Sequence, residues 1–566
     1  IFSVVSFLTW VSVHLPLTAV CEKTNHYKYS IEWFEKTPKK PYIYTINNLF
    51  LALPIQSKLD RYQIRFSSFE DQINTENPIR FIDAFVDKLD LQKLEFTTKT
   101  VKTEGRPAFE HSVYLKLYIY GYLNGLRSSR KLERECVRNI EVHWLLCGQQ
   151  PNYHSISDFR KDNPTALKNT FKLFVLFLKE CELIGGNTVA IDGTKVRANN
   201  SKKNNYNQKK IDRHLAYIEE KTVEYLKQLE ENDMNDHGLD IKHVQSKIDR
   251  LVEAKIKYEA LEKQLLCTDE PQVSTTDIDA RALLVQGQVV EVSYNLQAAV
   301  DEKHKLVVAT HTLNRNDRNA LSRAAQEAKD NVQTEELTVI ADKGYHNGRE
   351  LQTTQNAGIN TLVAMAELVN SNDHGTQPAY MVSKFTYHKE TDSYTCPEGQ
   401  TLTTKGTWHQ KKRDRNISYT FKKYRSPACT SCPMKHLCTG RQDGRREIER
   451  SEYAEAVERN NENYKNNQPL YRRRQEINEH IFGTIKRQWG YNHTNLRGLE
   501  KVNGEMALIM TVYNLKRSLN ILTMPKILEK LKNWTPDYER VTLFNNKRPF
   551  LRPLQQIELF GLRTAV

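Results

Sequence analysis

The stretch "NTVAIDGTK" (residues 187–195) decides the fold, because it places a carboxylate at the end of a short β-favouring run. Four strand-favouring residues precede Asp192, and a glycine follows it. The same order recurs in "ELTVIADKGYHNG" (residues 336–348), where Asp342 closes the run and Gly344 permits a sharp exit. The repeated pattern predicts two strands that each end in an aspartate.

Further apolar runs extend this prediction to a sheet. "VVEVSYNLQAAVD" (residues 289–301) and "HKLVVATHTL" (residues 304–313) are joined by a short turn and predict a β-hairpin. "INTLVA" (residues 359–364) predicts a strand beyond the second aspartate. The fold class is therefore α/β, a mixed sheet flanked by helices.

Helical sequence both precedes and interrupts the sheet. Residues 51–183 predict a helical N-terminal domain with Lys and Arg near its turns, which suits either helix-turn-helix contact with DNA or a plain packing module. Residues 207–266 carry an apolar seam at 4-3-4-3 spacing, interrupted by the polar turn "ENDMNDHG" (residues 231–238). This seam predicts an inserted antiparallel helical hairpin that serves as a spacer or dimerisation arm.

A third acid lies in the basic stretch "YRRRQEINEHIFGTIKRQWGY" (residues 471–491). Apolar residues recur there as on an amphipathic helix: Phe482, Ile485 and Trp489. Glu479 lies one turn before this stripe, and Lys486 lies on the same face about 10 Å further along the axis. Taken alone, the stretch is better explained as a surface helix with scattered charges.

Two strand ends and a helix that crosses them would bring Asp192, Asp342 and Glu479 to one point. At ~4 Å, each like-charged pair costs on the order of 4 kcal/mol, so such a cluster requires cations. Mg²⁺ suits carboxylate and water oxygens. Two ions ~3.5–4 Å apart can activate a water or hydroxyl and stabilise the leaving oxygen of a displacement at phosphorus. The three acids therefore predict a site for two Mg²⁺ or Mn²⁺ ions, with Lys486 contacting a phosphate.

The chain is similar to DDE transposases of bacterial insertion sequences, which have an RNase H-like catalytic core. The resemblance spans about residues 55–525, and five stretches carry it: "AIDGTKVRANNSKKNNYNQKKIDRHLAYIEEK" (190–221), "YNLQAAVDEKHKLVVATHTLNRNDRNAL" (294–321), "ADKGYHNGRE" (341–350), "EHIFGTIKRQWGY" (479–491) and "LRGLEKVNGEMALIMTVYNLKRSLNIL" (496–522). In the family two aspartates and a helical glutamate bind the metals, which matches Asp192, Asp342 and Glu479.

A related branch of transposases has a Tyr-Arg-Glu-Lys signature on this helix. Glu479 and Lys486 fit its Glu–Lys spacing, but the Arg position is Gln475 here, with Arg474 one residue earlier. Ile481 stands where many relatives have Pro. The resemblance implies that Arg474 and Lys486 contact phosphate.

Three other acids are rivals for the role of third ligand. Asp317 lies in "NRNDRN", Glu476 lies one turn before Glu479, and Asp279 lies in "TTDIDAR". All three rank below Glu479, because none matches the family's position. Asp317 and its neighbour Asn316 could still shape the rim of the pocket.

Four of the nine cysteines cluster, while the other five are scattered as in proteins of a reducing cytosol. Cys396 lies in "YTCPEGQ", and "PACTSCPMKHLCTG" supplies Cys429, Cys432 and Cys438. This spacing predicts a structural Zn²⁺ site, with His436 as a substitute ligand and free thiols as the alternative.

Positive charge is concentrated around these cysteines. Of the chain's net charge of +14, residues 401–450 supply +9, from 13 Lys/Arg and 4 Asp/Glu. Basic residues interleaved with aromatic residues are typical of a DNA-contacting surface. The predicted DNA contacts of this window are Lys411, Lys412, Arg413, Lys422 and Lys423.

The domain prediction follows from these features. Residues 184–525 form the catalytic domain, residues 385–450 a Cys-rich basic insertion within it, and residues 526–566 a C-terminal tail. Residues 1–50 are apolar but lack an initiator Met and a basic start, so we expect an upstream extension outside the native protein. A membrane anchor is the alternative for this segment.

The sequence therefore predicts an insertion-sequence transposase. We expect metal-dependent cleavage at the element's ends and strand transfer into target DNA by a homodimer or higher oligomer in the bacterial cytoplasm, at the nucleoid. The expected partners are terminal inverted repeats and target DNA, not a small molecule or a membrane. Two alternatives stay open: a metal-dependent nuclease without strand transfer, and an inactive transposon-derived DNA-binding protein.

Overall fold

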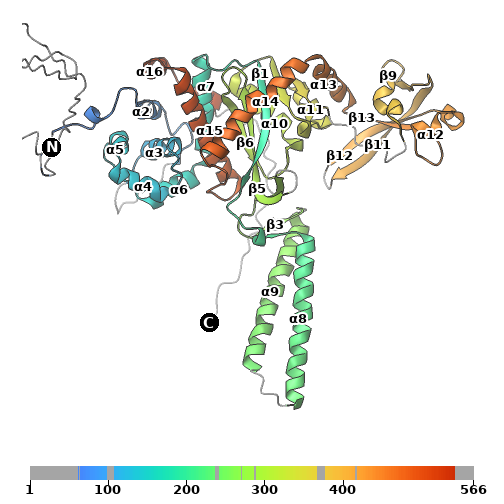
Figure 1. Cartoon of the computed structure of the whole chain (residues 1–566), viewed down its shortest axis with the longest axis horizontal. Helices are drawn as coiled ribbons and strands as arrows, with labels where there is room; N and C mark the ends of the chain where they lie inside the picture. The colour runs from blue at the N-terminus through green and yellow to red at the C-terminus, as the bar shows by residue number, and fades with distance from the viewer. Residues whose placement is uncertain are drawn as a thin grey trace, which may run out of the picture. The chain divides into compact units, whose positions relative to one another are not determined.

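The computed structural model describes residues 62, 64, 66–97, 108–235, 241–268, 270–285, 289–365, 376–414 and 417–541 (Figure 1). The chain divides into two compact units, Ile1–Ser67 and Ser68–Val566, and every helix and strand below belongs to the second. The predicted upstream extension at residues 1–50 lies outside the described residues, as does most of the predicted tail.

A mixed sheet carries the core of the second unit. Its strands run in the order β6–β5–β1–β7–β8, and β4 pairs with the first part of β5. The strand β5 is antiparallel to β1, β4 and β6, whereas β1, β7 and β8 are parallel neighbours. The bounds are β1 Thr188–Arg197, β4 Arg281–Val285, β5 Val289–Asp301, β6 Val307–Leu313, β7 Leu337–Ala341 and β8 Ile359–Val363. The predicted RNase H-like mixed sheet is confirmed.

Helices connect the parallel strands and cover the sheet, as parallel pairing requires. Helix α10 (Leu321–Val332) leads from β6 to β7, and α11 (Gly348–Asn356) leads from β7 to β8. Helix α14 (Gln468–Gly483) contacts β1, β5 and β7. Helix α15 (Leu499–Ile521) packs against β6 on one side and against the N-terminal helices on the other.

Two buried asparagines form hydrogen bonds with the free edges of β6 and β8, the two outer strands of the sheet. Asn514 of α15 accepts a hydrogen bond from the Val307 amide and donates one to its carbonyl, both at 2.8 Å. Asn460 of α13 (Ala454–Asn466) does the same for Val363, both at 2.9 Å. Each side chain replaces a missing strand partner, so the edges of β6 and β8 are satisfied at these positions.

The N-terminal helices pack around buried aromatic side chains. Their bounds are η1 Glu70–Gln72, α2 Ile79–Asp87, α3 His111–Leu123, α4 Ser129–Arg138, α5 Ile140–Leu145, α6 Tyr153–Asp162 and α7 Pro164–Glu180. Phe85 lies between Phe174 and Trp534, with ring centroids 5.1 and 6.2 Å away. Trp534 follows α16 (Met524–Asn533), which packs against α2, so part of the predicted C-terminal tail completes the helical region.

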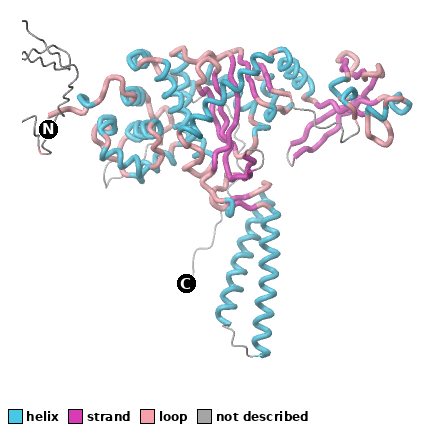
Figure 2. The backbone as a smooth tube through the Cα atoms, in the orientation of Figure 1, coloured by secondary structure: helices cyan, strands magenta, loops and turns pink. Residues whose placement is uncertain are grey.

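The predicted hairpin is present as α8 (Gln208–Asn235) and α9 (Ile241–Thr268), which lie side by side (Figure 2). A short ladder between β2 (Asn205–Tyr206) and β3 (Val273–Ser274) closes its base. Seam residues such as Ile211 are buried between the two helices. The hairpin leaves the sheet after β1, as its sequence position requires.

A separate antiparallel sheet forms the Cys-rich insertion. Its strands follow the order β13–β12–β11–β10–β9. The bounds are β9 Thr386–His388, β10 Ser393–Thr395, β11 Thr401–Asp414, β12 Ile417–Arg425 and β13 Glu447–Ser451, with the short helices η6 Pro378–Tyr380, η7 Val382–Lys384, η8 Pro427–Ser431 and α12 Lys435–Cys438. Its core is small: Phe385, Tyr394, Leu402, Tyr424 and Ile448.

Candidate active site

Asp192 and Asp342 occupy matching positions on neighbouring strands. The parallel pairing of β1 and β7 ends with Ile191 opposite Ala341. Asp192 and Asp342 are the next residues along the two chain segments. Paired strands lie about 4.8 Å apart, so the two carboxylates leave the sheet next to each other.

Asp192 does not end its strand, which corrects the sequence-based expectation. Strand β1 continues to Arg197, because its antiparallel partner β5 pairs with it as far as Ser293. Asp192 instead marks the point at which β1 leaves its parallel neighbour. Asp342 does follow the end of β7, and its Oδ1 accepts a hydrogen bond of 2.8 Å from the Gly344 amide.

Burial and neighbouring negative charge act together on Asp192. Removal from water raises the pKa of its carboxyl to about 6, and the charges of Asp342 and Asp317 act in the same direction. The Gly193 amide, which donates to Asp192 Oδ1 at 2.7 Å, and the Arg474 guanidinium oppose the rise in pKa. The site therefore holds a carboxylate whose charge is poorly compensated by the protein.

Asp317 lies beside this pair and is well supported. Lys195 Nζ approaches its Oδ2 at 3.1 Å, and the side-chain amides of Asn295 and Gln297 donate to its Oδ1 at 2.8 Å each. Burial raises the pKa of Asp317, but Lys195 and the two amides outweigh it, so the net pKa is lowered. The role of Asp317 at the rim of a pocket stays a prediction.

Gly193 is required by the close approach of that network. A Cβ atom at this position would lie 2.3 Å from Gln297 Nε2 and 2.4 Å from Asp317 Oδ1. Tyr345 also belongs to this network, because its buried hydroxyl donates a hydrogen bond of 2.5 Å to Gln297 Oε1. Neither Gln297 nor Tyr345 was predicted as a site residue, because nothing in the local pattern distinguishes them from other strand and turn residues.

Helix α14 places a cation against the first aspartate. Arg474 Nη1 lies 3.6 Å from Asp192 Oδ2. One residue on, Gln475 occupies the family's Arg position, and its Nε2 donates to Glu479 Oε1 at 2.6 Å. Glu479 itself is exposed.

The chain changes from α-helix to a π-helical turn, η9 (Thr484–Gln488), immediately after Gly483. Such turns inside helices re-aim side chains and occur often at functional sites. Here Lys486 reaches β1, and its Nζ donates to Thr194 Oγ1 at 3.1 Å and to the Lys195 carbonyl at 3.0 Å. Burial lowers the pKa of Lys486.

Arg474 and Lys486 therefore contact β1 from two points on either side of Glu479 along the helix. Among the described residues, no three His, Cys, Asp or Glu side chains are spaced to hold one metal ion. Glu479 as the third ligand, beside Asp192 and Asp342, thus stays a prediction.

The donor set fits a hard divalent cation. Asp192 and Asp342 offer only carboxylate oxygens, which Mg²⁺ and Mn²⁺ prefer. The raised pKa of Asp192 reflects burial beside like charge, which a bound cation would relieve. These two aspartates, with Glu479, are the residues that would hold the ion.

The other rival acids have structural partners. Glu476 forms an ion pair of 3.0 Å with Lys305. Asp279 accepts a 2.7 Å hydrogen bond from the Leu499 amide at the start of α15. Of the three rivals, only Asp317 acts electrostatically on Asp192.

The basic window forms the β11–β12 ribbon, and several of its charges are paired. Lys411 contacts Glu449 at 3.0 Å, Lys422 contacts Asp392 at 2.6 Å, and Lys423 contacts Glu447 at 3.0 Å. The side chains of Lys412 and Arg413 lie outside the described part of the ribbon. These acidic partners lessen the positive field expected from the sequence.

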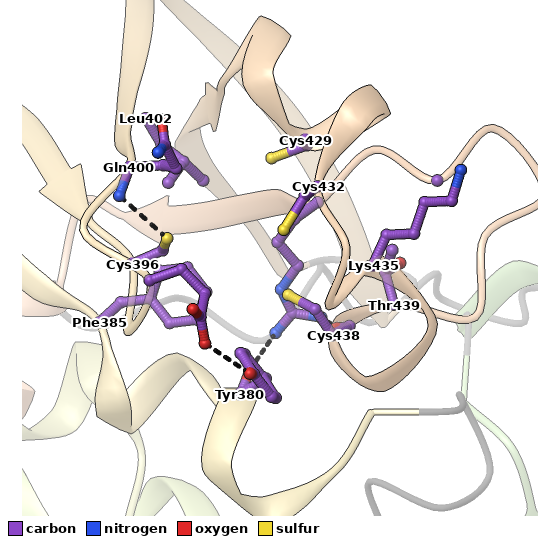
Figure 3. Close-up of a pocket in the computed structure, with 13 residues that line it drawn as sticks. Tyr380, Phe385, Cys396, Gln400, Leu402, Cys429, Cys432, Lys435, Cys438 and Thr439 are labelled. Carbon is purple, nitrogen blue, oxygen red and sulfur yellow. Dashed lines mark hydrogen bonds between the residues drawn. The ribbon is translucent and has the colours of Figure 1, made fainter.

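The four clustered cysteines line a single cavity in the Cys-rich insertion (Figure 3). All four are free and half-buried. His436 does not line this cavity, and its Nδ1 lies 3.0 Å from the Pro433 carbonyl oxygen.

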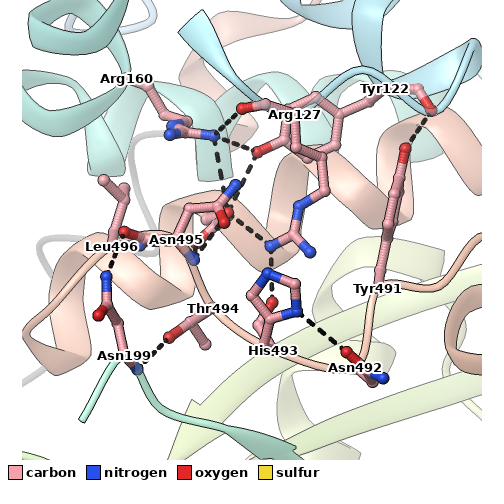
Figure 4. Close-up of polar contacts among 11 residues, drawn as sticks. Tyr122, Arg127, Arg160, Asn199, Tyr491, Asn492, His493, Thr494, Asn495 and Leu496 are labelled. Carbon is pink, nitrogen blue, oxygen red and sulfur yellow. Dashed lines mark hydrogen bonds and ion pairs between the residues drawn. The ribbon is translucent and has the colours of Figure 1, made fainter.

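The segment after η9 is tied to the helical region by a buried charge network (Figure 4). Glu505 of α15 lies 2.8 Å from Arg127 Nη2 and 3.6 Å from Arg160 Nη1, and it accepts from the Asn495 and Leu496 amides. The segment also extends β1: the Arg197 amide donates to the Asn492 carbonyl at 3.0 Å, and the Thr494 amide donates to the Arg197 carbonyl at 2.8 Å. The network thus fixes the exit of the helix that carries Glu479.

Two family models match separate parts of the chain. The family described as "Transposase DDE domain" matches residues 395–519, and "Transposase domain (DUF772)" matches residues 67–162. The first match includes Glu479 and Lys486, while Asp192 and Asp342 precede it. No curated protein and no solved structure matches the chain.

Both matched families are transposase domains, and transposases are nucleotidyl-transfer enzymes that act on DNA. The two matches support the assignment of this chain to the DDE transposases of insertion sequences, which the sequence resemblance implied. Within the described residues, no helix combines the length and the apolar character needed to cross a membrane.

Proposed function

We propose that this transposase cuts DNA at the ends of its element and joins the freed 3′-hydroxyls to target DNA. The observation that carries the proposal is the alignment of Asp192 with Asp342 at the end of the β1–β7 pairing, beneath the helix that bears Glu479. Divalent metal ions held by these three acids would activate the attacking oxygen and stabilise the leaving one.

The remaining groups of the site bind and orient the substrate. Arg474 and Lys486 are cations at two points along one helix, so they suit successive phosphates of a strand laid across β1. Lys195 forms an ion pair of 3.1 Å with Asp317 and so partly neutralises the acid beside the two aspartates. Gly193 leaves room for the Gln297 and Asp317 side chains beside the two aspartates.

The DNA partners are the element's terminal inverted repeats and the target. We infer that the N-terminal region predicted at residues 51–183 and the β11–β12 ribbon contact this DNA, and that a homodimer or higher oligomer assembles at the nucleoid. The hairpin of α8 and α9 would serve as the dimerisation arm.

The test uses duplexes that carry the DNA flanking the coding sequence. Wild-type protein with Mg²⁺ should nick the end and, given a precut 3′-end, join it to a plasmid. Asp192→Ala, Asp342→Ala and Glu479→Ala should abolish both products while end binding persists. Glu476→Ala, on the same helix and paired with Lys305, is the matched control and should keep both activities.

Each other outcome of this test would point to a different function or change the set of catalytic acids. Cleavage without joining would favour a nuclease over a transposase that completes strand transfer. Specific end binding with no cleavage in wild type would indicate an inactive DNA-binding protein. Full activity in any of the three acid variants would remove that acid from the catalytic set.

A further inference from the structure

The four cysteines of the insertion come from three separate segments and meet at one cavity (Figure 3). Cys396 follows β10, Cys429 lies in η8 with Cys432 just after it, and Cys438 ends α12. The cavity has a volume of about 30 Å³, enough for a single ion or water and little more. Four cysteines brought together from separate segments are the donor set of a structural zinc site.

The turn around Cys396 is arranged like a metal-binding knuckle. The Gln400 amide donates to Cys396 Sγ at 3.3 Å, and the Cys396 amide donates to the Gln400 carbonyl at 2.9 Å. Gly399 makes the turn possible with a φ of 76°. An amide aimed at sulfur stabilises a thiolate, the form in which cysteine binds metal.

Two cations line the same cavity and would offset the charge of four thiolates. Arg446 is held there by hydrogen bonds from its Nη1 to the Cys438 carbonyl at 3.1 Å and to Thr376 Oγ1 at 3.3 Å. Lys435 is the second. A tetrathiolate zinc centre carries a net charge of about −2, which these two side chains would balance.

The small hydrophobic core of the insertion is a further argument for a cross-link within it. Its core has five buried side chains, against which Cys396 and Cys438 pack. A core of this size stabilises a small module weakly, and natural modules of this kind add a metal or disulfides.

We propose that Cys396, Cys429, Cys432 and Cys438 bind one Zn²⁺ ion, which fastens η8 and α12 to the β9–β13 sheet. Among the described residues, no three potential ligands are spaced to hold one metal ion. Zinc binding would therefore bring the four thiols closer together and order the module around the ion. His436 is not among the proposed ligands, because it is exposed and does not line the cavity. This site is independent of the catalytic proposal above.

The test measures metal in the full chain purified under reducing conditions without added metal. Elemental analysis should find one zinc per chain, and Co²⁺ exchanged into the site should give the absorption of a tetrahedral thiolate complex. Cys429→Ser with Cys432→Ser should lose the zinc. Cys147→Ser, an exposed cysteine outside the insertion, should keep it. Asp192→Ala with Asp342→Ala should keep it too, which separates this site from the active site.

A second measurement covers the case in which the double Cys variant fails to fold. A mercurial reagent titrated into wild-type protein should release one zinc as four thiols react. Absence of zinc with all thiols reactive from the start would overturn the proposal. A mass lower by two hydrogen atoms per cysteine pair, without metal, would identify disulfides instead and would also overturn the proposal.

Discussion

Asp192 and Asp342 are each one residue beyond the paired Ile191 and Ala341, so two carboxylates project side by side from parallel strands. The protein compensates them only in part, with Arg474 at 3.6 Å from Asp192. This relationship is the structural basis of the proposed metal site.

Gly193→Ala should destabilise the protein and impair the pocket. The new Cβ would meet Gln297 and Asp317 at under 2.5 Å, so we expect a loss of roughly 1–3 kcal/mol in the free energy of unfolding. Gly483→Ala is the matched control, because nothing lies within 4 Å of its Cβ position and its backbone is helical. Urea unfolding of both variants checks this; equal stability of the two would contradict the crowding.

Arg474→Ala should slow DNA cleavage without unfolding the protein. Arg474 is the cation nearest Asp192, and loss of such a group from a site costs roughly ten- to hundredfold in rate. Its neighbour Arg473 pairs with Glu302 instead, so Arg473→Ala should change the rate less than threefold, by roughly 0.6 kcal/mol. Single-turnover cleavage assays compare them, and similar rates for the two would remove Arg474 from the site.

Glu505→Gln should destabilise the fold in a pH-dependent way. Burial raises the pKa of Glu505, but the charges of Arg160 and Arg127 outweigh it, so the folded pKa lies below the usual value of 4.5. A lowered pKa contributes stability that is present above the unfolded pKa and lost as pH falls through the folded one. We expect a loss of roughly 3–5 kcal/mol at pH 7, because two buried guanidinium groups lose their counterion.

Thermal unfolding at several pH values tests this sign. The difference between wild type and Glu505→Gln should be largest near neutral pH and should shrink as the pH falls below about 4.5. A difference that grows on acidification would contradict the assignment. The conservative change keeps an acceptor for the Asn495 and Leu496 amides, so the charge is the main loss.

Replacing Lys411, Lys412 and Arg413 with Ala should weaken DNA binding and reduce its salt dependence. Each lost phosphate contact lowers the slope of log K against log salt by about 0.9. The reduction should fall short of three contacts, because Lys411 already pairs with Glu449. The control removes the same charge from α9, by changing Lys242, Lys255 and Lys263 to Ala. If the control changes the salt slope by the same amount, net charge alone sets the slope.

Much of the framework follows from local sequence pattern. Apolar runs flanked by turn residues predicted β1, β5 to β8 and the hairpin of α8 and α9, because strand alternation and heptad spacing are encoded within a few residues. Asp342 was correctly placed at a strand end, since β7 has no partner beyond Ala341. The family matches added the transposase class.

What sequence could not predict depends on distant partners. Asp192 lies inside β1 because β5, about 100 residues away, continues to pair with it. The π-helical turn at Thr484–Gln488 has no local signature, yet it decides that Lys486 contacts β1. The partners of Lys422 and Lys423 lie on other strands and loops, so the neutralisation of the basic window appears only after folding.

The measurement that tests the central claim most directly is a metal switch at the three acids. Asp192→Cys, Asp342→Cys and Glu479→Cys are each assayed for cleavage with Mg²⁺ and with Mn²⁺, because a thiolate accepts Mn²⁺ far better than Mg²⁺. We expect each variant to be inactive with Mg²⁺ and to recover partly with Mn²⁺, while Glu476→Cys cleaves equally with both. A variant that stays active with Mg²⁺ would contradict metal ligation by that residue. So would a variant that keeps its fold and its end binding but that neither metal restores.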